Sequence, residues 1–228
     1  IDKSNRLCAT MKIYKYLQTT DIYKTGDNYT FKYDNLDRGL DICKKIGFKY
    51  YEVCHLFSQW GATATPKVMA YEDGEYKRIF GWDTDATGED YTTFIRQFIT
   101  ELLDFLKARG DDKRCFFHIS DEPQLDHLEQ YMKSKNSVLD LLEGYVIMDA
   151  LSNVDFYRQG IIKNPIPCNN HIEPFLAAKV PGLWTYYCCG QGKDVSNRFM
   201  AMPSYRNRVL GTQLYKFRIK GFLQWGLN

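Results

Sequence analysis

The chain has 228 residues, of which 44% are hydrophobic and 15% aromatic, enough apolar material for one large folded core or two small ones. Thirty Lys and Arg residues against 28 Asp and Glu residues give a formal net charge of +2, so no global field favours nucleic acid or an anionic membrane surface. The sequence shows neither a signal peptide nor an apolar run long enough to span a membrane.

Helical and strand patterns alternate from residue 34 onward. Residues 34–47 have apolar side chains at helical spacing and Gly47 as a stop, and the aromatic and β-branched stretch 48–57 follows as a strand. The alternation goes on to predict helices at 89–110, 124–136, 153–159, 171–179 and 204–219, and strands at 114–120, 144–152, 166–170, 182–189 and 221–228. Strands separated by helices favour parallel pairing in one sheet.

This order of elements predicts an α/β fold, and specifically a (β/α)8 barrel of the TIM type. Polar residues recur at the carboxyl ends of the predicted strands, where such barrels build their sites, and the Gly-rich turn of a nucleotide-binding doubly wound sheet is absent. A barrel of this type usually needs about 250 residues. We therefore expect residues 1–228 to be the C-terminal major part of a barrel catalytic domain that lacks its first one or two strands and belongs to a larger protein.

One connection is much longer than a usual strand-to-helix loop. Residues 58–88 contain an alternating pattern around Asp73-Gly74, which predicts a hairpin inserted beside the active face. Trp60 and Trp82 flank this hairpin, and they either line a pocket or anchor the hairpin to the rest of the fold.

The seven cysteines lie at 8, 43, 54, 115, 168, 188 and 189, without the paired spacing of a metal site. We expect most of them to be small buried hydrophobic residues, because a chain of this length does not need a disulfide framework.

The apolar stretch "CFFHISDEPQ", residues 115–124, ends in two adjacent acids. Strand alternation places His118 and Ser120 on one face, and by extension Glu122, in the interior of a barrel. Pro123 is expected to hold Glu122 in an extended conformation and to end the strand, so that Asp121 turns toward the rim.

Two neighbouring carboxyl groups can keep one of them protonated as a general acid. They are too close on the chain to straddle a sugar ring as a nucleophile and an acid, but they fit a substrate-assisted reaction in which the 2-acetamido oxygen of the substrate attacks the anomeric carbon. A solvated Asp-Glu-Pro helix start, with the acids at the helix dipole, explains the same residues without chemistry.

Six stretches together resemble a known family: "KYYEVCHLFSQWGATATPK", "FGWDT", "FFHISDEP", "DALSNVDFYRQG", "LWTYYCCGQGKDVSNRFMAMPSYRNRVLG" and "KGFLQWGLN". They look like the bacterial domain-of-unknown-function family 4091, which is similar to glycoside hydrolase family 123, the β-N-acetylgalactosaminidases. The resemblance runs from about residue 29 to the end of the chain, and to the second family it is most specific at the acidic pair.

The resemblance implies a barrel catalytic domain with β-sandwich regions beside it in the same protein, and a glycan or glycoconjugate substrate. It also implies retaining, substrate-assisted removal of terminal β-linked N-acetylhexosamine, with N-acetylgalactosamine as the first expectation. Asp121 would orient the acetamido group, and Glu122 would act first as acid and then as base. No metal or organic cofactor is implied. The sequence departs from the family in lacking the early barrel strands and any sugar ligands on them.

Seven further residues at or near predicted strand ends are candidates for substrate binding: His55, Trp60, His118, Asp149, Trp184, Tyr186 and Trp225. Trp60 would stack on a sugar, Tyr186 would bond the acetamido oxygen and Trp225 would form the floor of the site. Each of these residues has an alternative structural role: packing in the core or, for a histidine, a hydrogen bond to the backbone.

Two other functions remain open. Glu122 could work with Glu173 in a conventional two-carboxylate glycosidase, because Glu173 also follows a predicted strand. Alternatively, the chain could be a non-catalytic carbohydrate-binding barrel that keeps the cleft of the family without its activity.

Overall fold

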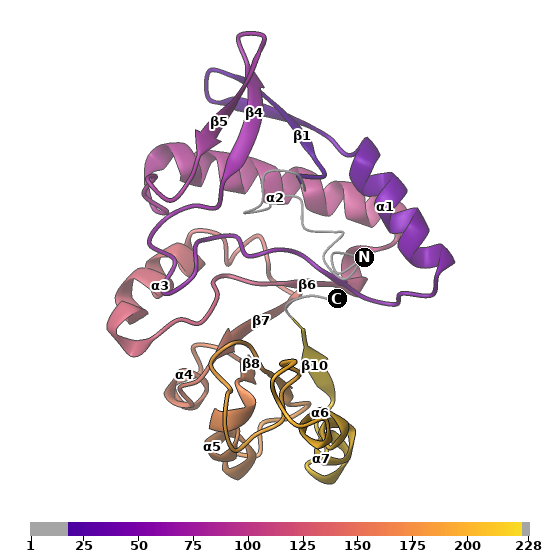
Figure 1. The fold of residues 1–228 in the computed structure, drawn as a ribbon. Coiled ribbons are helices and arrows are strands. Elements are labelled where there is room, and N and C mark those ends of the chain that lie inside the picture. The colour runs from indigo at the N-terminus through magenta and orange to yellow at the C-terminus, as the bar shows by residue number, and fades with distance from the viewer. Residues whose placement is uncertain (1–17, 225–228) are drawn as a thin grey trace. The chain divides into compact units, whose positions relative to one another are not determined.

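The computed structural model describes residues 18–224 and divides the chain into two compact units, the first ending at Ile147 and the second beginning at Met148. Both units mix helices with β-strands (Figure 1). Each is described by itself below.

A four-stranded sheet in the first unit is built from two hairpins. Strands β1 (Asp21–Thr25) and β2 (Asn28–Lys32) form one antiparallel pair, β4 (Val68–Glu72) and β5 (Glu75–Phe80) form the other, and β1 runs parallel to β4. The β4–β5 turn has positive φ at Asp73 (53°) and Gly74 (81°), which confirms the hairpin predicted from these two residues. The β1–β2 hairpin precedes residue 34 and was not predicted.

Helix α2 (Glu89–Arg109) covers this sheet (Figure 1). Its buried side chains recur at helical spacing, and Phe94 packs against Tyr29 of β2 and Phe80 of β5 at ring-centroid distances of 5.0 and 5.1 Å. The helix ends at Gly110, whose φ of 69° is the left-handed conformation that closes many helices. The predicted hairpin is therefore part of a sheet that shares an aromatic core with α2.

The first unit also contains parallel strands linked by helices, as predicted. Helix α1 (Asp34–Lys45) leads to β3 (Tyr51–Glu52), which pairs with β6 (Cys115–Phe117), and β6 pairs with the first two residues of β7 (Val146–Leu151). The short helix η2 (Asp112–Arg114) precedes β6, and η3 (Leu125–His127) and α3 (Leu128–Asn136) follow it. Strand β3 is only two residues long, so the strand predicted at 48–57 was too long at both ends.

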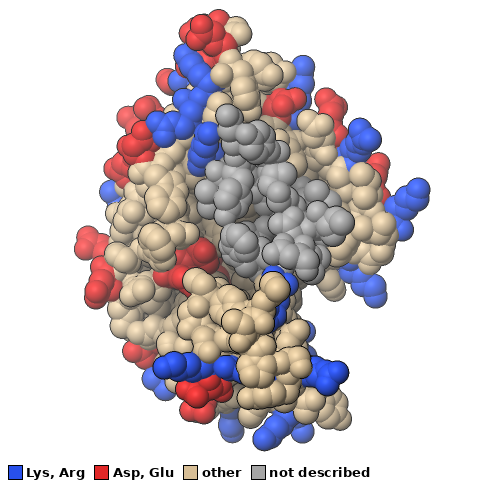
Figure 2. Space-filling view, viewed as in Figure 1, with Lys and Arg blue, Asp and Glu red and all other residues tan. Residues whose placement is uncertain are grey.

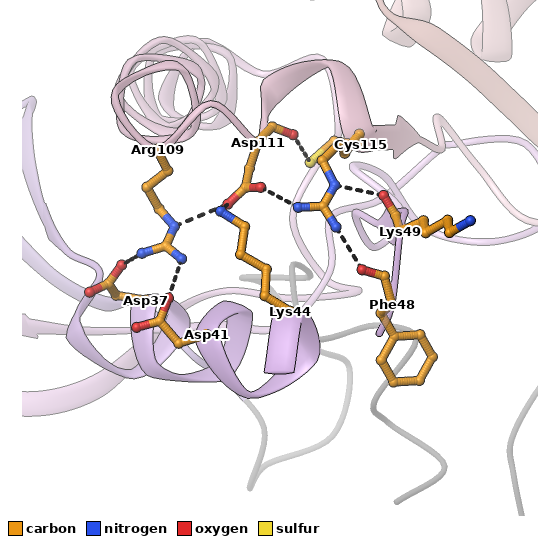
Figure 3. A network of polar contacts seen from close by, with 9 residues as sticks. Asp37, Asp41, Lys44, Phe48, Lys49, Arg109, Asp111 and Cys115 are labelled. Atoms are coloured by element: carbon orange, nitrogen blue, oxygen red, sulfur yellow. Dashed lines mark hydrogen bonds and ion pairs between the residues drawn. The ribbon is translucent and has the colours of Figure 1, made fainter. Parts of the chain in front are cut away.

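Figure 3 shows an ionic network at the amino ends of β3 and β6, which we call the aspartate clasp. Asp111 is fully buried and lies 3.0 Å from Lys44 Nζ, 3.2 Å from Arg109 Nε and 2.7 Å from Arg114 Nη1. Arg114 also donates to the carbonyl oxygens of Phe48 and Lys49, both at 2.6 Å. The clasp thus fastens α1, the end of α2 and the residues entering β3 and β6 to one another.

Arg109 extends the clasp to the surface of α1. Its guanidinium pairs with Asp37 and, at 2.6 Å, with Asp41. Every charged group of the clasp therefore has a counter-charge, so no buried ion is left uncompensated.

The second unit has two pairs of parallel strands. The last four residues of β7 pair with β8 (Asn164–Pro167), and β9 (Trp184–Tyr186) pairs with β10 (Gly221–Leu223). Between them lie the short helices α4 (Asp155–Arg158), η4 (Asn169–His171), α5 (Glu173–Ala177), α6 (Tyr205–Arg208) and α7 (Leu210–Lys216). The helix predicted at 204–219 is thus two short helices.

The mixed α/β class is confirmed, and strands separated by helices do pair in parallel, but in two sheets, β3-β6-β7-β8 and β9-β10, rather than in the one sheet predicted. The eight-stranded barrel, and the assignment of residues 58–88 as an insertion at an active face, stay predictions. Within residues 18–224, no helix is both long and apolar enough to cross a bilayer. Side chains of both charge signs are mixed on the face in Figure 2. Four cysteines are buried, as expected: Cys43, Cys54, Cys115 and Cys168.

Candidate active site

The segments that follow β3 and β6 run side by side. Backbone N–H groups of Val53, Leu56 and Phe57 donate to the carbonyl oxygens of Phe116, His118 and Ile119 at 2.8, 3.0 and 3.0 Å. The parallel alignment therefore continues well beyond the two residues of β3, toward the predicted acidic pair.

Two further contacts fix this alignment. The Tyr91 hydroxyl of α2 donates to the Leu56 carbonyl, and complete burial holds its pKa well above the usual value, so it remains a donor. The Ser120 hydroxyl donates to the Ser58 carbonyl at 2.8 Å. Ser120 was predicted to face a site, and the structure uses its hydroxyl to join the two segments.

This alignment brings two predicted site histidines together. The rings of His55 and His118 lie 5.0 Å apart, centroid to centroid. His118 Nε2 lies 3.3 Å from a carboxylate oxygen of Glu52, and His55 Nε2 lies 3.9 Å from one of Asp121. The second distance is too long for a hydrogen bond. We call these four residues the carboxylate–histidine series.

The series runs from the interior of the first unit to its surface. The side chain of His118 is 2% exposed, those of Glu52 and His55 are each 12% exposed, and that of Asp121 is 36% exposed. Asp121 is therefore the member that solvent reaches most, while the groups behind it are shielded. This arrangement can hold a solvent-facing carboxylate in a fixed orientation from behind.

Glu122 departs from the prediction made for it. Its φ is 49°, in the left-handed region, so the prediction that Pro123 holds it in an extended conformation is wrong. The restriction imposed by proline disfavours the right-handed helical conformation at this position, and the chain turns through the left-handed one instead. Strand alternation consequently ends before Glu122, and Asp121 is the acid whose contact with the histidines is established.

A second segment with left-handed backbone lies against the first. Trp60, Gly61 and Ala62 have φ values of 60°, 123° and 57°, and the Trp60 N–H donates to the Asp121 carbonyl at 2.7 Å. A Cβ on Gly61 would lie 2.3 Å from Cβ of His127, so this position requires glycine. Such a conformation costs free energy and persists because the surroundings enforce it, and these positions are common at functional sites.

The indole of Trp60 packs edge-to-face with that of Trp82, with ring centroids 6.2 Å apart. Both side chains remain about half exposed, at 50% and 51%. The rings contact each other and are half exposed, and both predictions for them, lining a pocket and anchoring the hairpin to the fold, stay predictions.

The remaining candidates belong to the second unit. Asp149 is fully buried in β7, and Tyr186 is buried in β9, where it pairs with Leu223. The Trp184 ring covers Gly221, at which a Cβ would lie 2.1 Å from the indole, so no larger residue fits there. Burial raises the pKa of the neighbouring Tyr187. Trp225 lies outside the described residues.

No group of three or more His, Cys, Asp or Glu side chains in residues 18–224 is arranged to hold a metal ion. A depression of about 260 Å³ lies between β2 and α2, lined by Tyr29, Arg96, Gln97, Thr100 and Glu101. None of these is a predicted site residue. The depression is wide open to solvent and is not the candidate site. The candidate site is instead located by the carboxylate–histidine series.

Residues 5–228 match the sequence profile described as the glycoside hydrolase 123 catalytic domain. The chain belongs to this family. A comparison with curated proteins finds no match. The predicted resemblance to glycoside hydrolase family 123 is thereby confirmed, and the narrower label of domain-of-unknown-function family 4091 stays a prediction.

A solved structure with a similar fold comes from work titled "The details of glycolipid glycan hydrolysis by the structural analysis of a family 123 glycoside hydrolase from Clostridium perfringens". It superposes with a TM-score of 0.70 at 13% sequence identity, over 95% of this chain and 40% of that chain. At this identity the likeness concerns the fold. This chain spans two fifths of the length of that protein.

Proposed function

We propose that the protein containing this chain is a glycoside hydrolase that removes terminal β-linked N-acetylhexosamine, with N-acetylgalactosamine as the leading candidate, by a retaining, substrate-assisted reaction. The observation that carries the proposal is the match of residues 5–228 to the glycoside hydrolase 123 catalytic domain. The position of Asp121 supports it, because this carboxylate is partly exposed and backed by His55.

In the first step of the proposed reaction, the Asp121 carboxylate accepts a hydrogen bond from the acetamido N–H of the substrate and aims the acetamido oxygen at the anomeric carbon. The oxygen forms a bond to that carbon as the glycosidic bond breaks. The Glu122 carboxyl group gives its proton to the departing oxygen. The product is a cyclic oxazolinium, whose positive charge the Asp121 carboxylate stabilises.

In the second step, the Glu122 carboxylate takes a proton from water as the water oxygen attacks the anomeric carbon. The ring of the intermediate opens and the acetamido group is restored. The two inversions give net retention of configuration. The roles of the two acids are those that the family resemblance implies, and the geometry adds the residues that hold Asp121.

The carboxylate–histidine series would keep Asp121 in place through this cycle. His118 Nε2 lies 3.3 Å from a Glu52 carboxylate oxygen, and the two imidazoles are neighbours, so the position of His55 depends on the residues behind it. We assign Glu52, His118 and His55 to positioning Asp121, in place of the sugar contacts first considered for the two histidines.

In the second unit, Tyr186 is proposed to donate its hydroxyl hydrogen bond to the acetamido oxygen, and Trp184, Trp225 and Asp149 are proposed to contact the sugar. Exchanging Tyr186 for Phe removes only the hydroxyl. The substitution should lower kcat on N-acetylated substrates and leave the fold intact, since no ring atom is lost.

A panel of three chromogenic glycosides tests the function directly: β-N-acetylgalactosaminide, β-N-acetylglucosaminide and unacetylated β-galactoside, each incubated with the intact protein. We expect cleavage of the N-acetylated compounds alone. Cleavage of the β-galactoside would point instead to a conventional pair such as Glu122 with Glu173. Binding of glycans without cleavage of any of the three would favour a non-catalytic carbohydrate-binding domain.

A further inference from the structure

Two tryptophans beside the acidic pair remain half exposed although they contact each other. Trp60 and Trp82 are 50% and 51% exposed, with ring planes at 74°. An exposed indole forgoes the stabilisation that burial of its large apolar surface would provide. In an edge-to-face pair, moreover, one ring offers only its edge to the other, so aromatic surface is left open to a third group. We call Trp60 and Trp82 the indole pair.

The position of Trp60 is enforced by the segment that carries the acids. A bulky residue with a φ of 60° is an outlier, and its N–H is bonded to the carbonyl oxygen of Asp121 at 2.7 Å. Two residues on, the Ala62 carbonyl accepts a hydrogen bond from the Ser134 hydroxyl of α3 at 2.8 Å. The backbone is thus held on both sides in a conformation that keeps the Trp60 backbone next to that of Asp121.

Trp82 is held by a tight turn at the end of β5. The Thr84 N–H donates to the Gly81 carbonyl at 2.9 Å, and that carbonyl also accepts the buried Thr65 hydroxyl at 2.9 Å. Arg78 and Asp83 form an exposed ion pair at 2.6 Å beside the turn. Arg78 and Asp83 at the edge of the indole pair can therefore donate hydrogen bonds to hydroxyl groups of a ligand and accept hydrogen bonds from them.

Aromatic faces next to polar groups bind sugars, because the C–H groups on one side of a sugar ring pack against the aromatic ring while its hydroxyls reach polar neighbours. We infer that the indole pair binds a second sugar residue of the substrate, the one adjoining the sugar that is cleaved. The inference rests on the proposed function and adds a specificity site to it: the protein would favour oligosaccharide or glycolipid glycans over single N-acetylhexosamine units.

The inference is tested by measuring glycan binding to a variant that does not cleave the glycan. Titration calorimetry on the intact protein carrying Glu122→Gln would compare two ligands, methyl β-N-acetylgalactosaminide and a methyl disaccharide ending in the same sugar. Neither has an aryl group that could stack on an indole. We expect Trp82→Ala to weaken the disaccharide about tenfold and to change the dissociation constant of the monosaccharide less than twofold. Trp82→Phe keeps a ring and should restore much of the affinity.

Tyr76→Ala is the matched control, because Tyr76 is an exposed aromatic residue of the same hairpin, 51% exposed, and contacts Tyr71 rather than the indole pair. It should alter neither constant. Equal affinity of the Trp82→Ala and unaltered proteins for the disaccharide, or no disaccharide binding at all, would overturn the inference. Disaccharide binding that depends on Trp82 in a protein that cleaves none of the three chromogenic glycosides would sink the proposed function and leave the indole-pair site standing.

Discussion

The two ends of the β3–β6 pair serve opposite purposes. At the amino ends, the aspartate clasp buries Asp111 completely and surrounds it with three cationic groups within 3.2 Å. At the carboxyl ends, Asp121 is 36% exposed, and its contact with His55 Nε2 is long, at 3.9 Å. One end has the close, compensated contacts of a structural ion cluster, and the other leaves a carboxylate available to a ligand.

Backbone conformation separates the two ends in the same way. Trp60, Ala62 and Glu122, all with φ between 49° and 60°, gather at the carboxyl ends. The loop between α2 and β6 reaches the left-handed region at Gly110, where it costs little. The unfavourable backbone conformations therefore lie at the carboxyl ends, together with the candidate site. The ionic contacts of the clasp lie at the amino ends.

The largest effect expected at the carboxyl ends is on turnover. Glu122→Gln and Asp121→Asn should each lower kcat on a β-N-acetylgalactosaminide on the order of 10²–10⁴-fold, because each removes a group proposed to act in the transition state. Asp126→Asn, an exposed acid four residues further on, is the control and should keep normal kcat. Unchanged turnover in either acid variant, with thermal melting confirming the fold, would remove that acid from the reaction.

At the amino ends, the largest effect is on stability. Asp111→Ala should lower the free energy of unfolding by about 3–5 kcal/mol, because it leaves Lys44, Arg109 and Arg114 without their shared buried counter-charge. Urea unfolding measures this, and kcat per folded molecule should not change. Asp104→Ala, which breaks an exposed pair with Lys107, should cost less than about 1 kcal/mol. If Asp111→Ala proves as stable as Asp104→Ala, the buried carboxylate at the amino ends does not have the structural role assigned to it.

Glu52 tests whether the carboxylate–histidine series acts through Asp121. Glu52→Gln should lower kcat about tenfold with KM little changed, since it replaces the carboxylate that lies 3.3 Å from His118 Nε2 behind the site. In combination with Asp121→Asn, the same substitution should have almost no further effect on kcat. If the two effects on kcat multiply instead, Glu52 influences the enzyme by a route that does not involve Asp121.

The smallest expected effect is on the free energy of unfolding, when the residue at position 122 is changed. Glu122→Gly should abolish turnover yet hold or raise the free energy of unfolding, by up to about 1 kcal/mol, because glycine adopts positive φ without steric cost. Gln130→Gly within α3 should instead destabilise by about 1 kcal/mol, as glycine does in a helix. Equal losses of stability in the two variants would show that the left-handed conformation at Glu122 carries no cost.

Periodicity in the sequence was enough to predict α1 and α2, because helical spacing of apolar residues reports directly which face is buried. The Asp73-Gly74 turn was predictable for a similar reason, since few residues tolerate positive φ twice in succession. The helical spacing and the turn are local signals, and the structure preserves them. His118 is 2% exposed, but Phe117 and Ile119 of the opposite face are buried as well, so the inward face predicted for His118 stays a prediction.

Features that depend on distant residues were not predictable. Extending the strand pattern as far as Glu122 failed, because the hydrogen bond between Trp60 and Asp121, 61 positions apart in the sequence, accompanies a change of backbone at both segments. The neighbouring Gly61 was the one available signal, since a glycine after a loop tryptophan is typical of a positive-φ turn. The clasp was missed because its charges come from two stretches far apart in the sequence, 37–44 and 109–114.

The central claim, that the acetamido group of the substrate is the nucleophile that the acidic pair directs, has one direct test. Chromogenic β-N-acetylgalactosaminides whose acetyl group carries none, one, two or three fluorine atoms would be given to the intact protein. Fluorine makes the acetamido oxygen a progressively weaker nucleophile while changing its size little. We expect kcat/KM to fall steadily along the series, by orders of magnitude in total. Equal kcat/KM for all four compounds would contradict the account.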